Sequence, residues 1–296
     1  MPALIEAINL GKSFGAVRAL NGLSLSIPKG GVYGVLGANG AGKSTFFRIC
    51  LDLVRPSEGS LCVLGAPAGN ARLLRRVGAM IETPRYYPFL TARETLVMLG
   101  QASGANNPPI DRWLARVGLA EAADRKVHHF SVGMKQRLGI AAALLAQPEL
   151  VILDEPTSGM DPAGIQEIRS LLRSLADDDG VTVVLSSHLL DEVQKVCDRV
   201  AIFDRGRLTA EGRIEELVAG QERLRILATP IEKILACFGD RAIPNGDSVL
   251  LRISRSEAPA ALRALFEDGV ELTEARWIGG ELETFFLQQT GAPRAD

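Results

Sequence analysis

A glycine-rich segment that ends in lysine and serine is the first part of the chain whose residues could do chemistry. Residues 37–44 read Gly-Ala-Asn-Gly-Ala-Gly-Lys-Ser, which fits the pattern G-x-x-x-x-G-K-[ST]. In such a loop the backbone N–H groups form a cradle for an anion, and the following helix adds its positive end. Lys43 can reach the β- and γ-phosphates of a nucleotide, and the Ser44 hydroxyl can bind Mg²⁺. This loop alone leaves kinases, GTPases and motor proteins open.

Two adjacent carboxylates follow an apolar run further along the chain. Residues 150–153 are Leu-Val-Ile-Leu, and Asp154 and Glu155 come directly after them. In an open parallel sheet, ligands bind at the carboxyl ends of the strands. We therefore predict that Asp154 holds Mg²⁺, directly or through water, and that Glu155 polarises the attacking water. His188 ends the next apolar strand; it could contact a γ-phosphate or simply cap the following helix.

Hydrophobic patterning predicts the elements that position these groups. Four apolar runs indicate strands, and a helix at 164–176 between the last two gives a βαβ unit with a parallel sheet. These runs are 32–36, 77–81, 150–153 and 181–185. Alternating segments at 4–10 and 19–27 predict an antiparallel β subdomain. Helical periodicity from Thr91, which opens a capping box with Glu94, predicts a helical insert.

A second, smaller domain is expected after residue 220. Strands are predicted at 223–227, 248–253 and 271–277, and helices at 231–238, 259–267 and 281–289. The fold class is therefore α/β, a P-loop NTPase core with a small α+β C-terminal domain. We place the nucleotide-binding domain at 1–220, its helical subdomain at about 83–145, and the accessory domain at 221–296.

Composition limits the possible functions. The 296 residues are 47% hydrophobic and 23% charged, with a formal net charge of −2. Such a balance indicates a globular protein and gives no reason to expect nucleic-acid binding. The charge-free stretch 95–110 is interrupted by Pro108 and Pro109, and no signal peptide is visible. Any membrane role is therefore expected to depend on a partner. His128 and His129 are expected to be surface residues without a metal.

A further motif gives the chain a family resemblance. Residues 130–138 read Phe-Ser-Val-Gly-Met-Lys-Gln-Arg-Leu. They resemble the signature Leu-Ser-Gly-Gly-Gln of the ATP-binding subunits of ABC transporters. The phosphate loop, this signature, the two carboxylates, the loop 158–161 and His188 follow one another in the order typical of that family. The resemblance covers residues 1–220, and the tail is similar to the accessory domain of many such subunits.

The resemblance implies a role for each matching residue. Phe14 stacks on adenine, and Thr45 joins the phosphate-binding residues. Ser131 and Gly133 touch the γ-phosphate of an ATP held by a second copy, and Asp161 communicates across that ATP-sandwich dimer. The predicted residues are, for ATP, Phe14, Gly37, Ala38, Asn39, Gly40, Ala41, Gly42, Lys43, Ser44 and Thr45; for Mg²⁺, Ser44, Asp154 and Glu82; for catalysis, Glu155 and His188; in the signature, Ser131, Val132, Gly133 and Met134; and in the inter-subunit loop, Ser158 and Asp161.

Two departures from the family pattern refine the expected function. Glu82 stands where the family usually has Gln, and Val132 and Met134 replace Gly and Gln of the signature. A Glu in this place with a Ser-x-Gly-Met-Lys signature resembles the subgroup that exports bacitracin, lantibiotics and similar peptides. Residues 86–91 match the segment that docks onto the integral membrane permease subunit. The resemblance thus implies a peripheral ATPase on the cytoplasmic side of the cell membrane, with ATP and Mg²⁺ as cofactors.

Three other functions compete with export. ABC ATPases of translation usually carry two tandem ATPase units, whereas this chain has one phosphate loop and one signature. ATPases of DNA repair separate these two motifs by a very long coiled coil, which is absent here. A regulatory or assembly subunit, in which ATP only locks a complex, remains open at this point.

Overall fold

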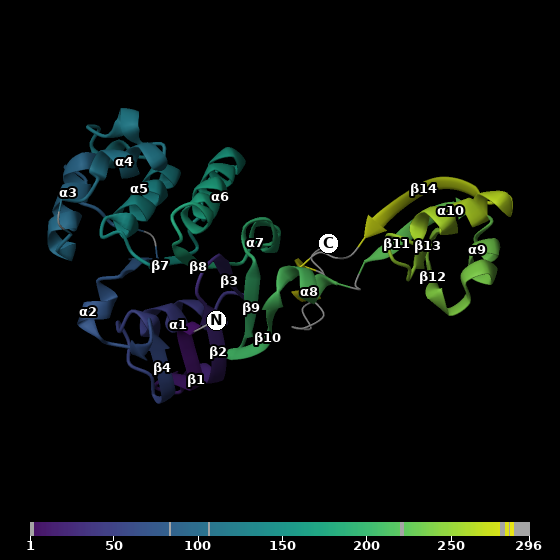
Figure 1. Cartoon of the computed structure of the whole chain (residues 1–296), viewed down its shortest axis with the longest axis horizontal. Helices are drawn as coiled ribbons and strands as arrows, with labels where there is room; N and C mark the ends of the chain where they lie inside the picture. Colours follow the sequence, from purple (N-terminus) through teal and green to yellow (C-terminus); the bar gives the residue numbers. More distant parts are fainter. Residues whose placement is uncertain are drawn as a thin grey trace. The chain divides into compact units, whose positions relative to one another are not determined.

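The computed structural model describes residues 3–82, 84–105, 107–219, 222–278, 282–283 and 285–286 (Figure 1). Tertiary contacts divide the chain into two units, Met1–Arg213 and Ile214–Asp296. Helix α8 (Ile214–Val218) thereby falls in the second unit. Gly220, where we expect the domain boundary, lies outside the described residues. None of the helices in the described ranges has both the length and the apolar character needed to cross a membrane.

A six-stranded sheet forms the centre of the first unit, with the strand order β10-β9-β3-β8-β7-β6. Its strands are β10 (Arg207–Arg213), β9 (Arg199–Asp204), β3 (Val32–Leu36), β8 (Thr182–Ser187), β7 (Leu150–Asp154) and β6 (Val77–Met80). All neighbours from β9 to β6 are parallel, and only β10 is antiparallel to β9. Strands β3, β7 and β8 are buried along their whole length, as their continuous apolar runs predict. The carboxyl ends of these three strands therefore meet at one edge of the sheet.

An antiparallel sheet of order β2-β1-β4-β5 lies below the central sheet in Figure 1. Its strands are β1 (Ala3–Phe14), β2 (Val17–Pro28), β4 (Glu58–Val63) and β5 (Ala66–Pro67). Alternate residues of β2, such as Leu23 and Leu25, are buried. They share one hydrophobic core with Phe46 and Phe47 of helix α1 (Lys43–Cys50), which starts directly at the phosphate loop. This core fixes α1, and with it the loop, against both sheets.

The helical insert contains α3 (Ala92–Ser103), α4 (Ile110–Arg116) and α5 (Val132–Leu144). The capping box predicted at Thr91 and Glu94 is confirmed, because each residue's side chain bonds the other's backbone N–H. Helix α5 packs on β6 and β7 as well as on α3 and α4. Helices α2 (Ala71–Leu74), α6 (Pro162–Asp177) and α7 (Leu190–Val196) complete the unit. The predicted α/β core with an antiparallel subdomain and a helical insert is thus confirmed.

The second unit contains a β-α-β-β-α-β succession: β11 (Arg223–Thr229), α9 (Ile231–Phe238), β12 (Ala242–Asn245), β13 (Ser248–Leu251), α10 (Ala258–Glu267) and β14 (Glu271–Ile278). Its sheet is antiparallel, with the order β12-β13-β11-β14. The buried residues of these strands and helices form a core of their own. The small α+β unit predicted from the sequence is confirmed, although β12 was missed. Most of the helix predicted at 281–289 lies outside the described residues.

Candidate nucleotide-binding site

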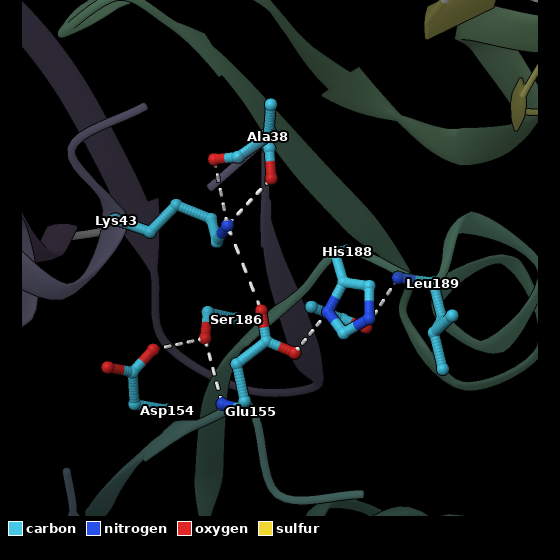
Figure 2. A network of polar contacts seen from close by, with 9 residues as sticks. Ala38, Lys43, Asp154, Glu155, Ser186, His188 and Leu189 are labelled. Carbon is cyan, nitrogen blue, oxygen red and sulfur yellow. Dashed lines mark hydrogen bonds and ion pairs between the residues drawn. The ribbon is translucent and has the colours of Figure 1, made fainter. Parts of the chain in front are cut away.

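The phosphate loop is closed by the side chain of its own lysine. Lys43 is only 6% exposed, and its Nζ donates hydrogen bonds to the carbonyl oxygens of Gly37 at 2.6 Å and Ala38 at 3.2 Å (Figure 2). A buried ammonium group needs such partners, because burying an unpaired charge is costly. The loop therefore encloses the Lys43 ammonium group, and a phosphate could replace the two carbonyl oxygens as its partner.

Two glycines of the loop are required by the backbone and by close packing. Gly37 has φ 154° and Gly42 has φ 107°, both in the region that favours glycine. A Cβ atom at Gly37 would lie 2.5 Å from the carbonyl oxygen of Phe203, and one at Gly42 would lie 2.7 Å from that of Ala19. The loop can approach its neighbours, and a ligand, only because these side chains are missing.

Glu155 connects the loop lysine to His188. Its Oε1 lies 3.8 Å from Nζ of Lys43, and its Oε2 lies 2.8 Å from Nδ1 of His188 (Figure 2). The three residues come from α1, from the end of β7 and from the end of β8. The parallel pairing of β3, β7 and β8 therefore brings together groups that are far apart in the sequence, as the position of their strand ends predicts.

Ser186 holds the two carboxylate residues in place, and sequence reasoning missed it. Its hydroxyl donates to Oδ1 of Asp154 and accepts from the backbone N–H of Glu155 at 2.9 Å. Asp154 and Ser186 are both buried and lie opposite each other in the parallel register. The sequence signal was available: Ser186 carries a hydroxyl directly after the apolar run 183–185 and two positions before His188.

The backbone of Glu155 is strained. Its φ is 51°, in the left-handed region that a non-glycine residue rarely adopts. The following turn is closed by a hydrogen bond from the Ser158 N–H to the Glu155 carbonyl, at 3.1 Å. Strain of this kind concentrates at functional sites, where the surroundings fix the side chain in one direction. Here the Glu155 side chain is directed toward Lys43 and His188.

The donor set beside the loop suits Mg²⁺. The buried carboxylate of Asp154 and the half-buried hydroxyl of Ser44 are hard oxygen donors, which Mg²⁺ prefers. In the described part of the chain no group of three His, Cys, Asp or Glu side chains could hold a metal. Such an ion would therefore complete its shell with phosphate and water oxygens, as Mg²⁺ usually does.

Glu82, the third predicted metal ligand, has a different partner in this structure. Its carboxylate forms an ion pair with Arg48 of α1 and is 62% exposed. Its backbone has φ 64°, another left-handed position. Among the described residues no hydrogen bond or ion pair joins Glu82 to Asp154 or Ser44. The sequence contained no signal for the pairing with Arg48.

The signature residues lie at the start of α5. Ser131 is the N-cap of this helix, and its hydroxyl accepts from the N–H of Met134 at 3.2 Å. Val132 is half exposed beside the loop 158–161, since a Cβ atom on Gly159 would lie 3.0 Å from its Cγ1. The signature and this loop are thus neighbours. Within the described residues no hydrogen bond or ion pair joins Ser131 to Lys43 or Glu155.

Two further predicted residues are placed at element ends. Asp161 is the N-cap of α6, and its Oδ1 accepts from the N–H of Gly164 at 3.2 Å. Phe14 ends β1 and is 46% exposed, with Nζ of Lys12 at 4.9 Å from the ring centroid. Phe14 is therefore a surface aromatic and not a residue of the hydrophobic core.

Comparison with known sequences agrees with this geometry. The ABC transporter family profile matches residues 20–158. The bacitracin transport ATP-binding protein BcrA of Bacillus licheniformis is 42% identical over 214 residues, which are 71% of this chain and 70% of that protein. The lantibiotic transport ATP-binding protein SrtF of Streptococcus pyogenes is 41% identical over 208 residues, 70% of this chain and 90% of that protein.

Solved structures show the same fold. An ATP-binding subunit of an ABC transporter is 30% identical and superposes with a TM-score of 0.65 over 72% of this chain and 91% of that one. A dimeric ATP-binding cassette, in a post-hydrolysis state with ADP and phosphate, is 25% identical with a TM-score of 0.64, covering 71% of this chain and 98% of that one.

Fold and site together define a P-loop ATPase of the ATP-binding cassette type. More narrowly, the chain belongs to the ABC transporter family, as an ATP-binding subunit that hydrolyses ATP. Cassettes of this family bind adenine nucleotides, form dimers and work with the membrane subunits of transporters.

Proposed function

We propose that this subunit energises the export of a peptide antibiotic, or of another small molecule, through a separate membrane permease, and so gives resistance. The observation that carries the hydrolytic part is the contact of Glu155 with both Lys43 and His188. The choice of substrate is supported by two named relatives: one serves bacitracin transport, the other lantibiotic transport. Glu82 and the Ser-Val-Gly-Met-Lys signature favour the same subgroup.

In the proposed reaction the γ-phosphate takes over Lys43 from the two carbonyl oxygens that hold it now. The backbone N–H groups of the loop, with Thr45, bind the remaining phosphate oxygens. Ser44 and Asp154 hold Mg²⁺, which neutralises charge on the phosphates when it is bound. Adenine stacks on Phe14, whose exposed ring leaves a face accessible.

Glu155 polarises the attacking water, because its carboxylate is fixed at the edge of the phosphate loop. His188 donates to Glu155 or to the γ-phosphate and positions both. A carboxylate and an imidazole beside the phosphate loop can orient the attacking water and stabilise the charge that develops on the γ-phosphate. With both Glu155 and His188 present, a subunit that binds ATP without hydrolysing it is disfavoured.

A second copy completes each site in this proposal. Ser131 and Gly133 supply N–H and hydroxyl groups at the amino end of α5, where helix geometry favours an anion. Among the described residues no hydrogen bond or ion pair joins Ser131 to the chain's own Lys43, which fits a role toward the partner's ATP. Ser158 and Asp161 lie in the adjoining loop and communicate between the copies. ATP then joins two copies, and its hydrolysis releases them.

The permease is proposed to contact the segment 86–91, where Tyr87 and Phe89 are exposed. We therefore propose that the subunit is a peripheral protein on the cytoplasmic side of the cell membrane. We propose that the boundary between the ATP-binding domain and the accessory domain lies between residues 220 and 221. The helical subdomain spans about 83–145.

The test is co-purification of the subunit with its permease, followed by transport in membrane vesicles. A panel that includes bacitracin, a lantibiotic and an unrelated linear peptide is offered on the side of the nucleotide site. ATP-dependent transport of bacitracin or of the lantibiotic across the vesicle membrane supports export. ATP turnover without movement of any panel member contradicts this substrate class. An assembly in which ATP is bound but not turned over would point to a regulatory subunit.

A further inference from the structure

Two exposed aromatic side chains stand next to each other in the helical insert. Tyr87 is 55% exposed and Phe89 is 61% exposed, and their ring centroids lie 5.5 Å apart. Under the proposed function, on which this inference rests, the pair belongs to the surface that meets the permease. The inference concerns the connection between this pair and the ATP site.

The aromatic segment is bonded to the segment that leads into the signature. The N–H of Val127 donates to the carbonyl oxygen of Leu90 at 2.8 Å, and the N–H of His128 donates to that of Pro88 at 3.1 Å. Thr91 and Lys126 form an antiparallel bridge between the same two segments. The stretch 88–92 therefore runs against 125–128, much like two short strands.

Only two residues separate this contact, which ends at His128, from the signature serine, Ser131. Residues 127–129 form a single 3-10 turn, and Phe130 is buried directly after it. Ser131 then caps α5. A buried residue and a helix cap leave little freedom between the turn and the helix, so a displacement of the turn is passed on to the amino end of α5.

His128 adds a side-chain bond at the centre of this contact. Its Nδ1 lies 2.9 Å from the carbonyl oxygen of Pro88, the same oxygen that its own backbone N–H reaches. A carbonyl oxygen only accepts, so Nδ1 carries the proton and donates. Pro88 lies between Tyr87 and Phe89 in the chain. Its carbonyl oxygen accepts two hydrogen bonds from His128, one from the ring and one from the backbone. The ring of His129 packs on that of His128, with 3.7 Å between centroids.

We propose that His128 is a positioning residue that ties the aromatic pair to the turn before Ser131. Through this tie, movement of Tyr87 and Phe89 by the permease shifts the signature end of α5, and with it the ATP held between two copies. His128 does not touch the nucleotide site. It is therefore expected to affect how ATPase activity responds to the permease, and not the activity of the isolated subunit.

The experiment compares His128→Ala with His128→Asn, because an Asn side chain can place an N–H close to the position of Nδ1. His129→Ala is the matched control, since no hydrogen bond joins that ring to Pro88 among the described residues. Amide hydrogen exchange is measured on the full-length variants, in the peptides that cover 89–93 and 126–131. ATPase activity is measured on each isolated subunit and on its complex with the permease.

In the His128→Ala variant the amide hydrogens of these two peptides should exchange about fivefold faster than in the wild type. Loss of one hydrogen bond between neutral groups implies an effect of this size. The isolated ATPase activity and melting temperature of this variant should stay near the wild-type values, while its stimulation by the permease falls. His128→Asn should restore both exchange and stimulation. Unchanged exchange or stimulation in His128→Ala would overturn the proposal, as would an equal loss in His129→Ala.

These measurements do not depend on the transported molecule. Loss of stimulation in His128→Ala, with rescue by Asn, supports the role of His128 even if no peptide of the panel is transported. If the His128→Ala variant transports normally and the permease stimulates its ATPase activity as in the wild type, His128 does not have this role. The export proposal is then unaffected.

Discussion

Nζ of Lys43 lies 3.8 Å from Oε1 of Glu155, so the cation of the phosphate loop faces the carboxylate at the end of β7. The lysine comes from α1, and the two residues are brought together by the parallel pairing of β3, β8 and β7. In the proposed reaction Lys43 changes partners when the phosphates enter, because it then meets an anion of higher charge. Substitutions at these two positions should therefore have separable effects on binding and on hydrolysis.

Replacing Glu155 by Gln should leave ATP binding intact and slow hydrolysis by about 10²–10⁴, the usual contribution of a positioned base. The amide keeps the size of the side chain but cannot accept a proton. An ATP-bound dimer should then accumulate and be visible by size-exclusion chromatography with ATP. Glu149→Gln, on the exposed pair with Arg76, serves as the control. Undiminished turnover in the Glu155 variant would remove this residue from the reaction.

Replacing Lys43 by Ala should abolish tight nucleotide binding, because it removes the flexible cation that faces the phosphates. It also leaves the carbonyl oxygens of Gly37 and Ala38 without the donor that they have now. Affinity for ATP is measured by calorimetry, with Lys29→Ala as a surface control. An affinity within about threefold of the wild type, roughly 0.65 kcal/mol, would contradict the assignment.

Glu82→Gln should keep much of the activity, because the shape and one oxygen of the side chain remain. Glu82→Ala should lose coupling to transport more than it loses ATP binding. Its melting temperature should change little, since exposed ion pairs such as Glu82–Arg48 contribute only about 0–1 kcal/mol. ATPase rate and peptide resistance are measured together in cells that contain the permease.

Arg48→Ala separates the two possible roles of Glu82. If Glu82 acts through its ion pair, Arg48→Ala should reproduce the defect of Glu82→Ala. If Glu82 contacts Mg²⁺, only the Glu82 variant should need more Mg²⁺ for half-maximal turnover. Wild-type resistance in Glu82→Ala would show that neither role matters for transport.

A fragment of residues 1–221 should fold and bind ATP, because the first unit and the second unit have separate hydrophobic cores. Circular dichroism and ATP affinity are the measurements. A second fragment ending at Arg213, the limit of the first unit, tests whether α8 contributes. An insoluble or unfolded 1–221 fragment would show that both units depend on each other for folding.

Glu211 should make stability depend on pH. Its pKa is raised above the ordinary 4.5, chiefly because burial disfavours the charged carboxylate; the Tyr33 hydroxyl, which donates to it at 2.9 Å, acts in the opposite direction. A raised folded-state pKa means that the folded protein holds the proton more tightly. This contribution is complete below pH 4.5 and is lost as pH rises through the raised value.

Glu211→Gln should therefore raise the melting temperature at pH 8 relative to the wild type, and the gain should shrink toward pH 4. Glu149→Gln is the control of opposite sign, since the Arg76 guanidinium lowers the pKa of Glu149. A Glu211→Gln variant that is less stable at pH 8 than at pH 4, relative to the wild type, would contradict the prediction.

The parts of the site that could be predicted are those whose residues are neighbours in the chain. The loop 37–44 and the pair Asp154 and Glu155 are short motifs that follow buried strands, so their chemistry and place are readable from local sequence. His188 was found for the same reason. Each depends on one strand and its end, and not on the register of two strands.

The parts that were missed depend on pairing between distant segments. Ser186 reaches Asp154 and Glu155 only because β7 and β8 lie in one parallel register. The pairing of Arg48 with Glu82 joins α1 to the end of β6, and nothing in either local sequence predicts it. Strand β9 was not predicted, although Val200 to Phe203 are all apolar and buried.

The left-handed backbone of Glu155 has a consequence for anyone who selects variants of this protein. Glycine or asparagine relieves strain at such a position, so both substitutions should increase resistance to heat. Both also remove the carboxylate. A directed-evolution screen that rewards thermal stability alone would therefore enrich inactive clones at this position, and a screen for this subunit must score turnover in the same round.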